Sequence, residues 1–312
     1  MARVLWRLAA ACATTLVVGG CVFTHEPNDP SAALPAADIF PAAEEPAGTF
    51  EDRMVTAANA ALDRGADISL ALLDRSDGEY AALADAVPFP TASVAKLFIA
   101  DDVLYRESRA EIDLTPDEHD RIGLMLERSD DDAANVLWNE YGGPEIVVDV
   151  ADRYRLAATT TPYDDNWWNT ETTPADVVDY YVGLLDGRGG LDDARRNEIL
   201  DHLRHSDDIS SDGYDQRFGL PDGLTSEPDL AVKQGWMCCI DDQWIHVSTG
   251  IVGDDDRFVL VLVSREDLDY GDADADYPDT SLTAAVDDVS AGHARETITA
   301  VVRTLFPQRR IQ

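Results

Sequence analysis

Lysine is almost missing from this sequence. Of its 24 basic residues only Lys96 and Lys233 are lysines, and all the others are arginines. A guanidinium is never deprotonated in proteins, whereas an amine can lose its proton when it is taken out of water. Either the two lysines survive by chance, or they mark places where arginine cannot serve, and the neighbouring residues must decide.

Positive charge is scarce as a whole. The chain has 24 basic residues against 61 acidic ones, which gives a net charge of −37. A phosphate backbone would be repelled by such a protein, so nucleic acid is excluded as a partner. A solvated acidic surface is the simplest explanation of this charge; adaptation to high salt and selection against anionic partners are the alternatives.

Long hydrophobic runs are absent after residue 20, so no transmembrane helix is predicted there. The first 20 residues resemble a secretory signal, because Arg3 and Arg7 precede an apolar segment too short to span a bilayer. The small residues Val18-Gly19-Gly20 before Cys21 resemble a bacterial lipobox. We therefore expect Cys21 to carry a lipid; an ordinary signal peptide cleaved nearby, with Cys21 incidental, is the alternative.

Three segments follow from this pattern. Residues 1–20 are predicted to be the lipoprotein signal, residues 21–49 a lipidated cysteine and a tether rich in proline and alanine, and residues 50–312 the folded domain. The protein is then expected to be exported and lipid-anchored to the outer face of the cell membrane, as a monomer.

Strand and helix periodicities are unevenly distributed along the folded part. Period-two patterns lie near the beginning, at 67–74 and 80–82, and again at 231–239, 244–252 and 257–264. Helical patterns fill the middle, from about 92 to 204, and also occur at 50–62 and 291–305. This order predicts an α+β fold with one five-stranded antiparallel sheet, terminal helices on one face and a reduced helical lobe.

Both lysines lie within short motifs. Ser93-Val94-Ala95-Lys96 begins a predicted helix, and residues three apart share a helical face, so the amine of Lys96 is expected beside the hydroxyl of Ser93. A serine hydroxyl needs a base to become a nucleophile. A desolvated lysine can be that base, although serine-x-x-lysine alone is a common pattern.

Two further motifs follow in order. Ser129-Asp130-Asp131 opens a predicted helix, and Lys233-Gln234-Gly235 lies on a predicted strand. Together with the first motif they resemble the three elements of class A β-lactamases and penicillin-binding serine hydrolases, here as an actinobacterial type of lipoprotein. The resemblance covers roughly residues 50–305.

The resemblance implies acyl transfer without a cofactor or a metal. Ser93 would be the nucleophile, Lys96 a candidate base and Ser129 the relay of a proton to the leaving nitrogen. Lys233, Gln234, Gly235 and Asp131 would bind substrate, a cell-wall peptide or a β-lactam. The backbone N–H groups of Ser93 and Trp236 would form the oxyanion hole.

Several residues depart from the family pattern. Asp131 replaces an asparagine, so an amide that can donate becomes a carboxylate that, when ionised, cannot. Gln234 replaces a hydroxyl residue, but its amide can still donate. The segment between Lys96 and Ser129 is short. The loop after Leu156 lacks the family's Glu-x-x-Leu-Asn, whose glutamate activates the deacylating water; the remaining acids of that loop are Asp164, Asp165 and Glu171.

The remaining cysteines, two neighbouring tryptophans and three histidines lie outside the three motifs. A disulfide between the neighbours Cys238 and Cys239 would be strained, which favours two thiols that point to opposite faces of a strand. Trp167 and Trp168 are expected to pack in the core rather than to wall a substrate groove. His202, His205 and His246 show no metal-ligand pattern.

Three hypotheses follow. The first is a serine hydrolase of the cell envelope that acylates Ser93 with D-alanyl-D-alanine peptides or β-lactams. The second is a working class A-like β-lactamase, which the missing glutamate disfavours. The third is a catalytically weak, cell-wall-binding lipoprotein that keeps the fold.

Overall fold

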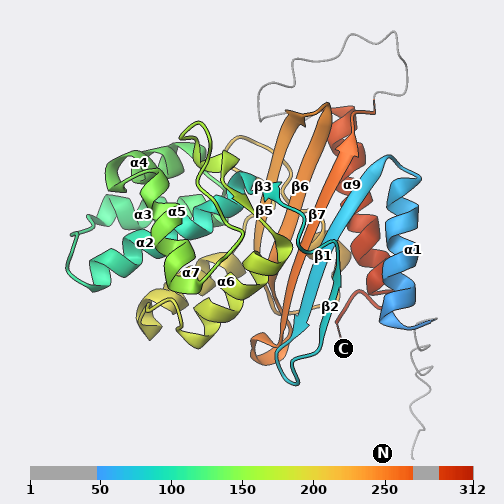
Figure 1. Cartoon of the computed structure of the whole chain (residues 1–312), viewed down its shortest axis with the longest axis horizontal. Coiled ribbons are helices and arrows are strands. Elements are labelled where there is room, and N and C mark those ends of the chain that lie inside the picture. The colour runs from blue at the N-terminus through green and yellow to red at the C-terminus, as the bar shows by residue number, and fades with distance from the viewer. Residues whose placement is uncertain (1–47, 270–287, 312) are drawn as a thin grey trace, which may run out of the picture. The chain divides into compact units, whose positions relative to one another are not determined.

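A five-stranded antiparallel sheet lies at the centre of the structure, in the strand order β2-β1-β7-β6-β5 (Figure 1). The structure is a computed structural model and describes residues 48–269 and 288–311. The predicted signal, Cys21 and nearly all of the predicted tether lie outside the described residues. Those that are described belong to one compact unit, Glu45–Gln312.

The strands of this sheet come from both ends of the chain, as the periodicity predicts. They are β1 (Ala66–Asp74), β2 (Tyr80–Leu83), β5 (Leu230–Ile240), β6 (Gln243–Val252) and β7 (Phe258–Asp267). A separate short pair joins β3 (Phe89–Pro90) and β4 (Glu171–Thr172).

The helices are α1 (Phe50–Leu62), α2 (Ala95–Ser108), α3 (Pro116–Glu127), α4 (Asp131–Tyr141), α5 (Pro144–Tyr154), α6 (Pro174–Asp186), α7 (Asp193–Arg204), α8 (Leu220–Gly223) and α9 (Val289–Leu305), with short 3-10 turns η1 (Ala92–Val94), η2 (Trp167–Asn169) and η3 (Asp254–Asp256). Local signals set several of their ends. Thr115 caps α3 and Pro116 is its first residue, and the side chains of Asp130 and Asp192 cap α4 and α7.

Alternation along the central strand β7 builds two cores. Val259, Val261 and Val263 belong to the apolar cluster on the side of the helical lobe. Leu260 and Leu262 belong to the cluster that contains residues of α1 and α9. Successive side chains of a strand point to opposite faces, so a continuous apolar run serves both layers.

Helices cover both faces of the sheet. Figure 1 shows α1 and α9 side by side on one face of the sheet, while α2 to α7 form the lobe on the other. The predicted fold class is therefore confirmed: an α+β protein with a five-stranded antiparallel sheet, terminal helices on one face and a helical lobe beside it. The first turn of α2, next to β5, is where the candidate site lies.

Candidate active site

Ser93 lies in the turn η1, directly before α2. Its neighbour Ala92 has a φ of 45°, a left-handed conformation that alanine rarely adopts. Lys96 follows within the first turn of α2, and its Nζ lies 3.0 Å from Ser93 Oγ. Ser93 is 7% exposed and Lys96 is completely buried. The predicted pair of serine and lysine is therefore in hydrogen-bond contact.

Lys96 Nζ has three hydrogen-bond partners. Besides Ser93 Oγ these are the main-chain oxygen of Ser129, at 2.6 Å, and Oδ1 of Asp131, at 2.5 Å. The oxygens of Ser129 and Asp131 can only accept, so they hold two N–H groups of the amine. The remaining tetrahedral position points at Ser93, and in a neutral amine that position is the lone pair.

Burial has the largest influence on the charge of this amine. It lowers the pKa of Lys96 below its usual range, and the nearby carboxylate of Asp131 opposes part of this effect. The ring of Trp167 covers the amine from another side, with Nζ 4.7 Å from the ring centroid. Burial thus favours the neutral amine, whereas the carboxylate of Asp131 and the ring face of Trp167 both favour the charged form.

The second predicted pair is also in contact. Lys233 Nζ donates to Ser129 Oγ at 2.7 Å and to the main-chain oxygen of Gln234 at 3.2 Å. Burial, and after it the charge of Lys96, hold the pKa of Lys233 well below its usual range. Ser129 has a φ of 54° just before α4 begins. Both lysines of the chain are therefore bound to serines, and Ser129 contacts both of them.

Gly235 brings strand β5 against the turn that holds Ser93. A Cβ atom placed on Gly235 would lie 2.9 Å from the main-chain oxygen of Thr91 and 3.3 Å from the nitrogen of Ser93. Only glycine lets the two backbones approach so closely. The next residue, Trp236, lines the cavity beside Ser93.

We predict that Gly235→Ala lowers the free energy of unfolding by about 1–3 kcal/mol, because the added methyl group collides with fixed main-chain atoms. Gly292→Ala is the matched control, since its nearest neighbour is a flexible arginine at 3.8 Å; in α9 it should be neutral or stabilising by up to about 1 kcal/mol. Chemical denaturation of both variants measures the difference. Equal stabilities would contradict the close approach.

Gln234 is placed away from this cavity. It is 1% exposed, and its Nε2 donates to the main-chain oxygen of Phe218. Successive residues of a strand face opposite sides, so Gln234 points away from its neighbours in the motif. Its amide N–H is engaged inside the protein, in contrast to the substrate contact that the sequence predicts.

A cavity of about 300 Å³ opens beside Ser93. Trp167 and Trp168 line it, although Trp167 is also buried in the lobe core, where its indole nitrogen donates to Asn135 Oδ1 at 2.9 Å. The prediction that these tryptophans pack in the core rather than wall a groove is thus only half right. The lining is Ala92, Ser93, Asp131, Asn135, Trp167, Trp168, Asp212, Trp236, Met237 and Cys238.

Asp212 is a cavity residue that the sequence analysis missed. It lies on an exposed loop, and its Oδ1 accepts from the main-chain nitrogen of Tyr214 at 3.1 Å. The loop belongs to none of the three motifs, and an aspartate before a glycine is ordinary turn chemistry. No sequence signal separates it from the other acidic loop residues of this chain.

The acids of the loop after Leu156 do not line the cavity. Asp164 accepts hydrogen bonds from Asn166 and Asn169. Asp165 offers its main-chain oxygen to Trp138, and Glu171 is exposed in β4. Among the described residues, the loop thus presents to Lys96 the aromatic ring of Trp167 rather than a carboxylate.

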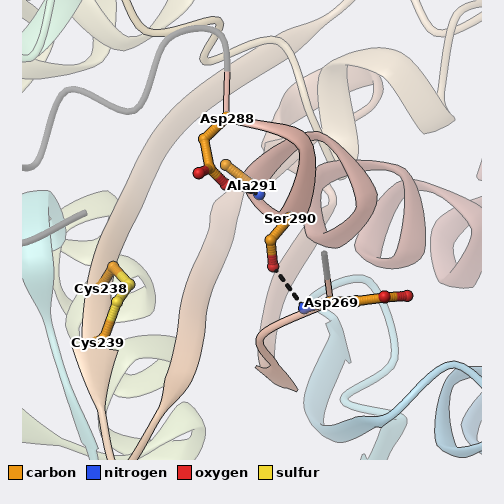
Figure 2. The surroundings of a disulfide bond; sticks show 6 residues. All are labelled: Cys238, Cys239, Asp269, Asp288, Ser290 and Ala291. Atoms are coloured by element: carbon orange, nitrogen blue, oxygen red, sulfur yellow. Dashed lines mark hydrogen bonds between the residues drawn. A yellow bond between two sulfur atoms is a disulfide. The ribbon is translucent and has the colours of Figure 1, made fainter. Parts of the chain in front are cut away.

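Cys238 and Cys239 form a disulfide, so the expectation of two separate thiols is wrong (Figure 2). The physical reason lies in the strand. The pairing of β5 with β6 shifts register between Met237 and Ile240, so the two cysteines lie outside the regular alternation. Cys238 also lines the cavity.

The described part of the chain offers neither a metal site nor a membrane-spanning helix. In residues 48–269 and 288–311 no group of three or more histidine, cysteine, aspartate or glutamate side chains is placed to hold a metal ion. Over the same residues, no helix has the length and apolar character needed to cross a membrane.

No family model matches the chain. A protein of Mycobacterium tuberculosis named "Putative lipoprotein LppW" is 42% identical to it over 264 residues, which cover 85% of this chain and 77% of LppW. LppW of Mycobacterium bovis gives the same values.

Solved structures share the fold at lower identity. PBP-A matches with a TM-score of 0.62 and 17% identity, covering 85% of this chain and 98% of its own. A β-lactamase from Chitinophaga pinensis matches with a TM-score of 0.61 and 16% identity, covering 83% and 98%. The fold is therefore that of serine β-lactamases and related penicillin-binding proteins.

Proposed function

The chain belongs to the family of the mycobacterial lipoprotein LppW, and from this premise we propose that it is a serine hydrolase of the cell envelope that forms an acyl-enzyme at Ser93. The substrates we propose are D-alanyl-D-alanine peptides or β-lactams. One observation carries the proposal: Lys96 Nζ lies 3.0 Å from Ser93 Oγ, with its other two partners both acceptors.

The first step is attack by Ser93. Neutral Lys96 takes the hydroxyl proton, and Ser93 Oγ bonds to the substrate carbonyl carbon. Negative charge then develops on the carbonyl oxygen, which we place between the backbone N–H groups of Ser93 and Trp236. Such donors typically contribute about 3–4 kcal/mol to transition-state stabilisation. The approach of β5 to η1 at Gly235 supports this placement.

The second step expels the leaving nitrogen. The hydroxyl of Ser129 gives it a proton, and the proton that Lys96 took from Ser93 then returns to the Ser129 hydroxyl, so that Lys96 is neutral again. Lys233 donates to the Ser129 hydroxyl at 2.7 Å and so fixes its position, and we propose that the same amine donates to a substrate carboxylate. Gln234 has no part in this scheme, because its amide is bound to Phe218.

The β-lactamase alternative has less support. Its deacylation needs a base that activates water, and neither Asp164, Asp165 nor Glu171 lines the cavity. A binding protein without turnover is favoured by one observation, the contact of 2.5 Å between Lys96 and Asp131. If this carboxylate keeps the amine protonated, no base remains for Ser93.

Intact mass spectrometry of the folded domain with benzylpenicillin separates these functions. We expect one persistent adduct per protein, which is lost in Ser93→Ala. Gly292→Ala serves as a control that keeps the adduct, because it lies in α9 and touches nothing in the site. Rapid turnover would support the β-lactamase instead, and an unmodified wild type would support the binding protein.

We also propose the location that the sequence predicts, an exported protein anchored by lipid on Cys21 with the tether of residues 21–49 before the domain of residues 50–312. The name of the relative, "Putative lipoprotein LppW", supports this proposal. The membrane is then a partner through the lipid, and the protein acts as a monomer.

Cys21→Ala is expected to move the protein from the membrane fraction to the soluble fraction or to block its processing, because the lipid has no other attachment point in the lipobox. Fractionation with immunodetection measures this. Cys12→Ala, in the same segment, is the matched control and should fractionate like the wild type. A Cys21→Ala protein that is processed and stays with the membrane would disprove the anchor.

A further inference from the structure

Negative charge lines the cavity beside Ser93. The carboxylates of Asp131 and Asp212 are part of its lining, and the lining residues within the described chain include no lysine, arginine or histidine. Lys96 is 0% exposed and Lys233 is 1% exposed. A polar group that enters the cavity therefore meets two exposed acids before it meets either amine.

Asp131 is both held and accessible. Its Oδ1 accepts from Lys96, which fixes the side chain, yet 47% of that side chain remains exposed. Among the described residues Lys96 is its only side-chain hydrogen-bond partner. The carboxylate thus keeps unused acceptor capacity toward the cavity, and an ionised carboxylate has no proton to donate.

This chemistry distinguishes two kinds of substrate group. The carbonyl oxygen of an acylamido group would face the lone pairs of Asp131 with no hydrogen between them. A protonated amine would donate to the carboxylate, and a hydrogen bond between charged groups is stronger than a neutral one. The indole ring of Trp168, which lines the same cavity, also attracts a cation and not a carbonyl oxygen.

The position of Asp131 sets where that amine must be. Ser93 Oγ and Asp131 Oδ1 both bond to Lys96 Nζ, at 3.0 and 2.5 Å, so two successive hydrogen bonds separate them. On the basis of the proposed acyl transfer, we propose that the site selects acyl donors that carry a protonated amine on the acyl side, near the scissile carbonyl. Asp131 is the residue that selects them.

Ampicillin and benzylpenicillin test this, because they differ only by an amino group on the side-chain carbon. At a pH of about 6, where that amine is protonated, ampicillin should acylate Ser93 about tenfold faster than benzylpenicillin, the effect expected of one charged hydrogen bond. The measurement is the second-order rate of adduct formation by intact mass. In Asp131→Asn the ratio of the two rates should fall to about one.

The ratio separates selectivity from reactivity. Asp131→Asn also changes the surroundings of the Lys96 base. Both penicillins depend on that same base, so this change affects both rates alike and cancels in their ratio. Asp132→Asn is the matched control: it removes the same charge one residue away, from an exposed side chain outside the lining, and should keep the ratio. Equal acylation rates with the two penicillins in the wild type, or an unchanged rate ratio in Asp131→Asn, would overturn this inference but leave the proposed acyl transfer standing. No adduct with either penicillin would overturn the acyl transfer itself, and the inference with it.

Discussion

Replacing Lys96 by arginine should reduce acylation of Ser93 by at least about 10²–10⁴-fold, the usual contribution of a positioned general base. Arginine keeps the positive charge, and with it an ion pair to Asp131, but it cannot accept a proton at neutral pH. Labelling by a fluorescent penicillin measures the rate. Undiminished labelling of the variant would remove Lys96 from the mechanism.

Two controls keep this result interpretable. The site of Lys96 is completely buried, so the larger guanidinium can disturb the fold, and thermal unfolding of the variant must be measured alongside. Lys96→Met fills a similar volume without a charge and cannot accept a proton either. If Lys96→Arg unfolds, a folded Lys96→Met that still acylates at the wild-type rate contradicts the role equally.

The same amine predicts a pH dependence for the acylation. The base works only when neutral, so the rate should rise with pH through the pKa of Lys96, which burial lowers. Asp131 raises this pKa, in opposition to burial. Removing its charge in Asp131→Asn should therefore move the rising limb of the profile to lower pH. A limb that moves to higher pH would contradict the assignment.

The second large effect concerns deacylation. We expect burst kinetics with penicillins: one equivalent consumed per Ser93, followed by hydrolysis about 10²–10⁴-fold slower than with a general base in place. The reason is that the loop beside Lys96 contributes the ring of Trp167 to the cavity and no carboxylate. Stopped-flow absorbance at several enzyme concentrations measures the burst and the steady state.

Steady-state turnover at tens per second would contradict this prediction. Replacement of single acids by their amides would then identify the base, first in the loop (Asp164, Asp165 and Glu171) and then in the cavity lining (Asp131 and Asp212). Asp132→Asn, one residue from Asp131 and outside the lining, is the control for the loss of charge alone.

Local signals explain why so much of the fold could be predicted. The predicted helix at 144–154 has the bounds of α5, because Pro144 suits a first turn and the chain leaves the helix at Arg155, which is left-handed. The strands of the sheet could be predicted because side chains alternate between the two faces of a strand, which gives its sequence a period of two. Periodicity and helix caps depend on residues only a few positions apart, so both can be identified from the sequence alone.

In the candidate site, too, local contacts could be predicted and contacts between distant segments could not. Ser93 and Lys96 are one helical turn apart, so their contact follows from local geometry, and the structure has it at 3.0 Å. Local geometry does not determine which other groups surround Lys96. Its contact with Asp131 joins positions 35 residues apart, and the ring of Trp167 reaches it from the loop between α5 and α6.

By itself the sequence determined the fold class, the three motifs and the fact that both lysines of the chain lie in two of them. Only the tertiary structure decided that Asp131 binds Lys96, that Gln234 faces Phe218, that Asp212 enters the cavity and that Cys238 is joined to Cys239. The direction of a side chain beyond its own turn or strand is set by packing and hydrogen bonds among distant segments, and by the bulge that interrupts β5, none of which a local pattern encodes.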